Sequence, residues 1–109
     1  MPSTRQGSWD RPPPGVVAQA SETLSLLASP VRLQIVWLIG DGEADVSSLT
    51  QALGSAGPAV SQQLTKLRLA GVVQARREGR RQMYRVIDAQ VVALARQAID
   101  LHGDLPTAG

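Results

Sequence analysis

The sequence of 109 residues contains no cysteine and only one histidine, His102. The lack of cysteine excludes disulfides, thiolate metal sites, iron–sulfur clusters and thiol redox sensing. With one histidine and no cysteine, the common nucleophile–base pairs of enzymes are missing as well. The glycine cluster "GSAGP" lacks the lysine of a phosphate-binding loop. We therefore expect a protein that is not an enzyme and needs no cofactor.

Aromatic residues and long apolar runs are also scarce. Phenylalanine is absent, and the only aromatic residues are Trp9, Trp37 and Tyr84, so the core must consist of leucine, valine, isoleucine and alanine. No run of 18 apolar residues exists, and the N-terminus has no apolar signal region. These absences predict one small domain in the cytoplasm, without a membrane partner.

The charge of the chain is unevenly distributed. Although the net charge is only +2, residues 58–87 carry seven basic residues and one acid, Glu78. That stretch has a charge of +6, whereas the rest of the chain sums to −4. Such clustering is typical of a surface that binds a polyanion.

The hydrophobic pattern predicts five helices and a hairpin. In residues 16–28, Val16, Ala20, Leu24 and Leu27 form one helical stripe. Ser29 as N-cap and Pro30 at the first helical position predict the start of the next helix, and Gly40 predicts its end. Because this helix is apolar almost all round, we expect it to lie deepest in the core. A third helix is predicted to begin after Asp45, its N-cap, and to stop at Gly54, and the last helix to begin after Asp88 as N-cap.

The segment from Pro58 to Val73, "PAVSQQLTKLRLAGVV", predicts a helix with two different faces. Val60, Leu64 and Leu67 form a buried stripe. Hydroxyl and amide side chains on the other side suit base edges, and lysine and arginine suit phosphates. The alternative is a solvated polar face without function. The candidate DNA-contacting residues of this helix are Pro58, Ser61, Gln62, Gln63, Thr65, Lys66 and Arg68. Leu69 does not suit DNA, and we expect it to rest near the following strand.

After Gly71 the sequence predicts two strands with a turn near Glu78 and Gly79. The tip "RREGRR" places four arginines around a glycine that can adopt positive φ. Such a projection would contact phosphates or enter the minor groove, and its alternative is an exposed turn kept soluble by charge. The candidate residues are Arg76, Arg77, Arg80 and Arg81.

Two short helices with a tight link, followed by a basic hairpin, predict a mainly α fold with a small β-hairpin, the winged helix-turn-helix. Residues 16–103 would form the DNA-binding and dimerisation domain. Residues 1–15 hold four of the seven prolines and are predicted to be a disordered arm. Residues 104–109 would be a flexible tail.

Four motifs, "LASPVRLQIVWLI", "VSSLTQAL", "PAVSQQLTKLRLAGVV" and "REGRRQMYRV", resemble the ArsR/SmtB family of bacterial winged-helix repressors. The resemblance covers about residues 16–102. It implies a homodimer formed mainly by the first and last helices, and repression of an inverted-repeat operator in double-stranded DNA that is relieved by an effector. The broad apolar face of the last helix fits such pairing. The sequence does not identify the effector.

The resemblance also implies which residues read bases: Ser61, Gln62 and Gln63, with Thr65 and Lys66 beside them. Family members often have histidine where this chain has Gln63, which implies a different preferred operator.

The sensing sites of the family are incomplete here. The Cys-x-Cys of many relatives corresponds to residues 45–47, which hold no cysteine. A second family site, on the last helix, corresponds to Asp88, Gln90, Leu101 and Asp104, with His102 one residue out of place. Asp88, His102 and Asp104 are the remaining candidate metal ligands. Carboxylates alone bind zinc or nickel weakly, so we expect no metal as effector.

The leading hypothesis is therefore a dimeric, sequence-specific DNA-binding transcriptional repressor. The alternative is a winged-helix protein-interaction module that does not read DNA, because a fold does not fix function.

Overall fold

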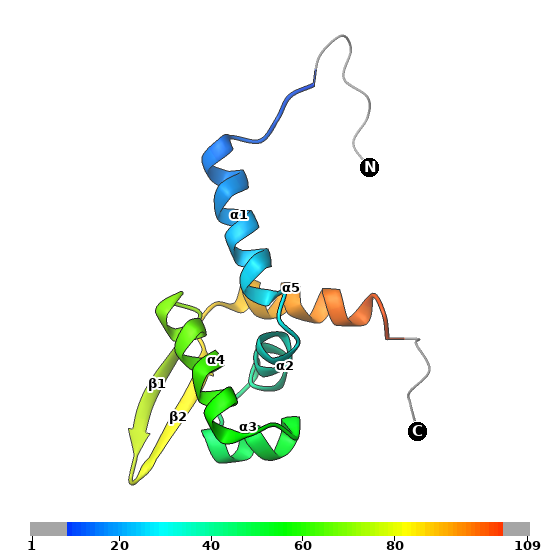
Figure 1. Ribbon diagram of the computed structural model, residues 1–109. Coiled ribbons are helices and arrows are strands. Elements are labelled where there is room, and N and C mark those ends of the chain that lie inside the picture. The colour runs from blue at the N-terminus through cyan, green and yellow to red at the C-terminus, as the bar shows by residue number, and fades with distance from the viewer. Residues whose placement is uncertain (1–8, 104–109) are drawn as a thin grey trace.

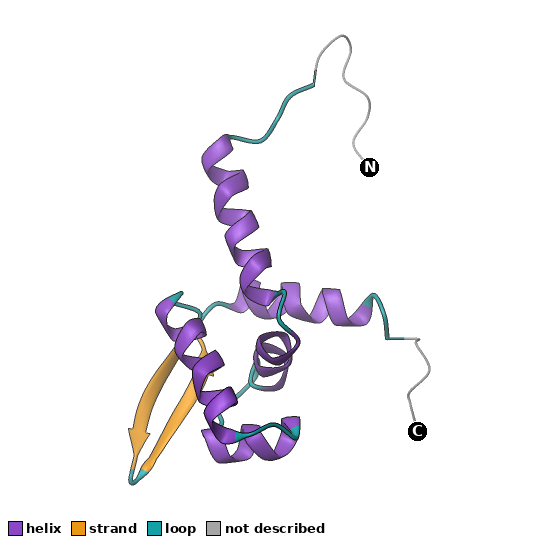
Figure 2. Ribbon diagram, in the orientation of Figure 1, coloured by secondary structure: helices purple, strands orange, loops and turns teal. Residues whose placement is uncertain are grey.

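The computed structural model describes residues 9–103 and confirms the predicted order of elements (Figures 1 and 2). A two-stranded antiparallel sheet projects from one end of a group of five helices, as expected for a winged helix-turn-helix. None of the described helices is both long and apolar enough to cross a membrane. The elements are α1 (Pro14–Leu27), α2 (Pro30–Leu38), α3 (Val46–Leu53), α4 (Gly57–Leu69), β1 (Val73–Glu78), β2 (Arg81–Val86) and α5 (Ala89–Asp100).

The predicted helix caps are present. The Ser29 hydroxyl accepts a hydrogen bond from the Arg32 amide at 3.3 Å, and the Asp45 carboxylate accepts one from the Ser48 amide at 2.8 Å. Gly54 ends α3 with a φ of 65°, a conformation that glycine adopts without steric cost. These local signals set the boundaries of the helix-turn-helix.

Helix α1 begins two residues earlier than the sequence indicated. Pro14 and Gly15, which were predicted to belong to the arm of residues 1–15, form its first turn. Proline fits this position because its missing N–H has no acceptor in the first turn of a helix. Of the remaining predicted arm, residues 1–8 lie outside the described residues, as does the predicted tail, residues 104–109.

The core lies where α2, α4, β1 and α5 meet. Ile35 and Val36 of α2 are fully buried, as are Val60, Leu64 and Leu67 of α4. Each such side chain stabilises the fold by about 1.5–3 kcal/mol relative to an exposed one. The other core members are Leu27, Ile39, Leu49, Val72, Val73, Val91, Val92 and Ala95.

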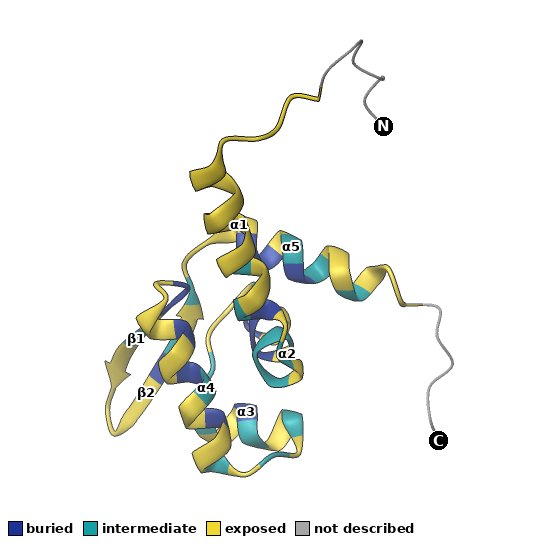
Figure 3. Cartoon of the chain, turned by 45° about the horizontal axis from the view of Figure 1, so that its top comes forward, coloured by how far each residue is buried: buried dark blue, intermediate teal, exposed yellow. Residues whose placement is uncertain are grey.

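Helix α2 lies in the core through Ile35 and Val36, as expected, although Trp37 and Leu38 on its other side are 45% and 41% exposed. The expectation for α1 is wrong. In the predicted stripe of α1 only Leu27 is buried, while Val16 and Leu24 are more than half exposed. The physical reason is visible in Figure 3: α1 projects away from the other helices, and only its C-terminal end meets them. Nothing among residues 9–103 covers the rest of it.

The predicted hairpin is confirmed, including its turn. Strands β1 and β2 pair antiparallel from Val73 with Val86 to Glu78 with Arg81, which leaves a two-residue loop. Gly79, the first loop residue, has a φ of 62°. Hydrogen bonds in both directions between Ala44 and Tyr84 attach the loop before α3 to the outer edge of β2. This attachment ties the base of the wing to the helix-turn-helix.

Gly40 has a different role from the one expected. Helix α2 ends at Leu38, two residues before Gly40, whose φ is not positive. A Cβ atom at this position would lie 2.6 Å from the Val92 Cγ1 atom of α5. Glycine therefore allows the close approach of α2 and α5.

Candidate nucleic-acid interface

Helix α4 presents its polar residues to solvent, as predicted. Its buried stripe is confirmed, and the side chains on the opposite side are free of the core. The Thr65 hydroxyl donates a hydrogen bond to the Ser61 carbonyl of the preceding turn at 3.0 Å. The exposed candidate residues are Pro58, Ser61, Gln62, Thr65, Lys66 and Arg68.

The N-terminus of α4 is open. No side chain caps the helix at Ala56, in contrast to the caps of α2, α3 and α5. The positive end of the helix dipole therefore carries no anionic partner among the described residues, and such an end favours a phosphate.

Gln63 differs from the other predicted base readers. It is half-buried on the flank of α4, and its Oε1 atom accepts a hydrogen bond of 2.6 Å from the Arg32 guanidinium of α2. Bidentate recognition of adenine needs both the oxygen and the amide nitrogen of a glutamine. Because Arg32 holds this oxygen on the half-buried flank of the helix, the structure separates Gln63 from the exposed Ser61 and Gln62.

The expectation for Leu69 is wrong. Its side chain is 84% exposed and does not rest on the following strand. At 100° per residue it points away from the stripe of Val60, Leu64 and Leu67, whereas Gly71, with a φ of 77°, turns the chain back toward that stripe. β1 therefore follows the buried side of α4, and Leu69 remains in solvent.

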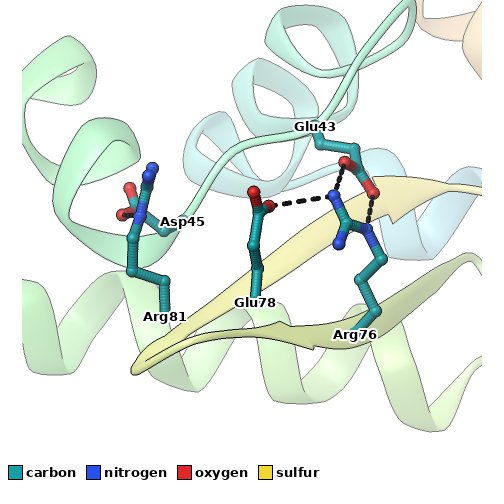
Figure 4. Close-up of polar contacts among 5 residues, drawn as sticks. All are labelled: Glu43, Asp45, Arg76, Glu78 and Arg81. Atoms are coloured by element: carbon teal, nitrogen blue, oxygen red, sulfur yellow. Dashed lines mark hydrogen bonds and ion pairs between the residues drawn. The ribbon is translucent and has the colours of Figure 1, made fainter.

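Two arginines of the wing, Arg76 and Arg81, are bonded to carboxylates. Arg76 donates two hydrogen bonds to Glu43, at 2.6 and 2.7 Å, and one to Glu78 at 3.0 Å (Figure 4). The guanidinium lowers the pKa of the Glu43 carboxyl through these hydrogen bonds. Arg81 donates a hydrogen bond of 2.8 Å to Asp45, the N-cap of α3. Two of the four predicted phosphate contacts therefore already have carboxylate partners.

The other two arginines are free to meet a polyanion. Arg77 and Arg80 are exposed and have no ion-pair partner among residues 9–103. Side chains alternate along a strand, so Arg77 lies on the opposite face of β1 from Arg76. Since Arg76 faces the loop before α3, Arg77 lies on the face that also carries Val73, which packs on the core with α4.

Sequence reasoning missed Arg32, Glu43 and the second role of Asp45. The acids of "GDGEAD" and the basic hairpin have complementary charges, but 33 residues separate Glu43 from Arg76 and 36 separate Asp45 from Arg81. Charge alone does not indicate which arginine meets which acid. The signal that could have found the contact is the alternation of the strand, combined with the attachment of Ala44 to β2.

The candidate metal ligands do not meet within the described part of the chain. Asp88 caps α5 by accepting hydrogen bonds from the amides of Gln90 and Val91. His102 follows the other end of α5, about 20 Å away at 1.5 Å per residue. Asp104 lies outside the described residues, among which no group of three or more possible ligands occurs. One subunit alone thus does not bring Asp88 and His102 together.

Comparison with known proteins identifies the family. Residues 29–75 match the model of the bacterial regulatory protein, arsR family. The repressor SmtB of Mycobacterium tuberculosis is 37% identical over 93 residues, which are 85% of this chain and 69% of the relative. This chain belongs to the ArsR family of bacterial regulatory proteins.

Further relatives agree with this assignment. The regulator NmtR of M. tuberculosis is 40% identical over 82 residues, 75% of this chain and 68% of NmtR. The crystal structure of the repressor BigR from Xylella fastidiosa superposes with a TM-score of 0.76 at 30% identity, covering 85% of this chain and 93% of BigR. These relatives are transcriptional regulators, and the family favours a DNA-binding repressor with a winged helix-turn-helix fold over the protein-interaction module.

The contact between Asp45 and Arg81 predicts a specific pH dependence. Hydrogen bonds from Ser48 and Arg81 lower the pKa of the Asp45 carboxyl from 3.8 to about 2. Because the folded protein holds this proton less tightly than the unfolded chain, the ionised carboxylate stabilises the fold above about pH 4. That contribution is lost as the pH falls toward 2.

The Asp45→Asn variant tests the pH-dependent stabilisation by Asp45, because asparagine keeps an oxygen for the cap but does not titrate. We expect the variant to unfold at a lower temperature than the wild type at pH 7, and this difference to shrink between about pH 4 and pH 2. Thermal unfolding followed by circular dichroism measures both. A difference that stays constant from pH 7 to pH 2 would contradict the assigned contact.

Proposed function

We propose that the protein acts as a homodimer that binds an inverted-repeat operator and represses transcription until an effector releases it. The observation that carries the proposal is the exposed polar side of α4, together with two arginines of the wing, Arg77 and Arg80, that have no ion-pair partners in the described chain. Strand β1 of the wing packs against α4. In this arrangement α4 enters the major groove and the wing follows the adjacent phosphates.

The proposal assigns different roles to residues of the interface. Ser61 and Gln62 read base edges, since a glutamine with a free amide bonds adenine through both oxygen and nitrogen. Lys66 and Arg68 contact phosphates, together with Arg77 and Arg80 of the wing. Arg76 and Arg81 instead position the wing, because each is already bonded to a carboxylate of the loop before α3.

Dimerisation would explain the apolar surface that one chain leaves open. Leu24 is 55% exposed and Leu101 is 78% exposed. Both border an apolar groove of about 440 Å³ between α1 and α5. A second copy that covers it would bury these side chains, and a two-fold axis would place two α4 helices about 34 Å apart. The remaining groove residues are Leu27, Ala28, Leu33, Leu94, Gln97 and Ala98.

The assignment of the wing predicts how DNA binding depends on salt. Replacing Arg77 and Arg80 by alanine removes two phosphate contacts from each subunit, and therefore four from the proposed dimer. We expect binding to every duplex to weaken, and the slope of log affinity against log salt concentration to become shallower by about 4. Fluorescence anisotropy with a labelled random-sequence duplex measures this slope.

The matched control is the double variant Glu43→Gln and Arg76→Gln, which removes a wing arginine without a change of net charge. We expect its salt slope to equal that of the wild type. If the slope of the control became shallower by about 2, half the change expected for the Arg77/Arg80 variant, Arg76 would be a phosphate contact and the division of the wing arginines would be wrong.

The proposed dimer predicts a monomeric variant. Leu24→Asp places a charge in the apolar groove, where burial without a partner is unfavourable. We expect sedimentation equilibrium to give the mass of one chain at concentrations where the wild type is a dimer. Leu69→Asp, which changes an equally apolar side chain 84% exposed at the end of α4, should remain dimeric. A dimeric Leu24→Asp variant would exclude this surface as the interface.

A further inference from the structure

The Arg32 side chain joins three helices. Its Nε atom donates a hydrogen bond of 2.7 Å to the carbonyl of Leu26 near the end of α1, and its Nη1 atom donates one of 2.6 Å to Gln63 of α4. Arg32 itself belongs to α2 and is half-buried. One planar guanidinium group thus holds atoms of α1 and α4 at a fixed distance from each other.

We infer that Arg32 and Gln63 are a positioning pair that sets the orientation of α4 for sequence-specific binding, and that Gln63 does not read bases. The inference rests on the proposed function. It changes the role that the family resemblance implied for Gln63, and it gives Arg32 a role in specificity although Arg32 lies on a different helix from the residues that read bases.

The Leu26 carbonyl needs this donor. In a continuous helix it would accept a hydrogen bond from the amide four residues later, but that residue is Pro30, which has no N–H. Arg32 supplies the missing donor and places a positive charge at the C-terminal end of α1, where the helix dipole favours it. The bond to Leu26 therefore fixes the orientation of the guanidinium that binds Gln63 of α4.

The contact also fixes the amide of Gln63. Arginine has no acceptor atom, so the atom that faces it must be the carbonyl oxygen of the glutamine. At 100° per residue, Gln63 lies about 60° from Val60, the first residue of the buried stripe, whereas Gln62 lies on the exposed side. Gln62 thus presents its whole amide to solvent, whereas the oxygen of Gln63 is turned toward Arg32 on the flank of α4.

The consequence concerns specificity more than attraction to DNA. Charge on α4 and the wing attracts any duplex, but reading bases requires α4 to keep its orientation in the groove. A variant that loses the contact should retain most of its affinity for random DNA and lose its preference for one sequence.

The test first recovers a preferred duplex by in vitro selection from a random library with the unmodified full-length protein. The preference is the ratio of the dissociation constants for a scrambled duplex and for the selected one, measured by anisotropy at one salt concentration. Failure to recover any preferred duplex would contradict the proposed function itself, independently of the role of Gln63.

Two substitutions at position 63 separate positioning from reading. Gln63→Glu keeps an oxygen for Arg32 but has no donor, whereas Gln63→Met keeps the shape without an acceptor. We expect Gln63→Met to lower the preference about tenfold, because it removes a hydrogen bond to a charged group, and Gln63→Glu to keep it within about threefold. The added charge of glutamate weakens binding to both duplexes and cancels in the ratio.

Arg32 provides the second arm of the test. Lysine cannot reproduce the two bonds of the guanidinium, so Arg32→Lys should lose as much preference as Arg32→Met. The double variant Arg32→Met and Gln63→Met should lose no more preference than the single variant with the larger loss, because both substitutions remove the same contact. Thermal unfolding identifies variants that do not fold. If Arg32→Met is among them, the comparison of Gln63→Glu with Gln63→Met is sufficient to test the inference. Equal losses in Gln63→Glu and Gln63→Met, or a new preferred base after selection with Gln63→Met, would overturn the inference.

Discussion

The burial of one stripe of α4 determines which side chains of this helix face solvent. Val60, Leu64 and Leu67 are fully removed from solvent and pack in the core with α2 and β1. Because a helix turns by a fixed angle per residue, this packing leaves Ser61, Gln62, Thr65 and Lys66 in solvent. A helix that is polar on one side could then face a duplex without exposing its apolar side.

Two further sets of contacts hold the surroundings of α4 in place. Carboxylates of the loop before α3 bind Arg76 and Arg81, so the wing is attached to the helix-turn-helix at its edge and through charged side chains. Exposed ion pairs of this kind each contribute little to stability. Their effect is on position, and they divide the arginines of the wing into paired and unpaired ones. Arg32 bonds to Gln63 in the middle of α4 and to the Leu26 carbonyl of α1, and so positions these helices relative to each other.

Much of the fold could be predicted from local signals in the sequence. Ser29, Asp45 and Asp88 cap their helices as expected, and Gly79 adopts positive φ in the turn of the wing. These signals act within four residues, so a single sequence contains the whole interaction. The stripe of α4 follows from periodicity for the same reason.

The missed features all depend on contacts between distant segments. Glu43, Asp45 and Arg32, the missed partners of Arg76, Arg81 and Gln63, are 31 to 36 residues away. The exposure of Leu24 and Trp37 follows from what one chain cannot cover, and an apolar pattern alone does not distinguish a core from a surface between two chains. The pattern thus identified apolar and basic residues correctly but not their partners.

The central claim is that the exposed side of α4 faces DNA. Because the chain has no cysteine, Ser61→Cys introduces a unique thiol for a photo-activated cross-linker, and Ala93→Cys on the exposed side of α5 is its control. The account predicts that irradiation with a selected duplex links DNA to position 61 and not to position 93. Equal cross-linking at both positions, or none at position 61, would contradict it.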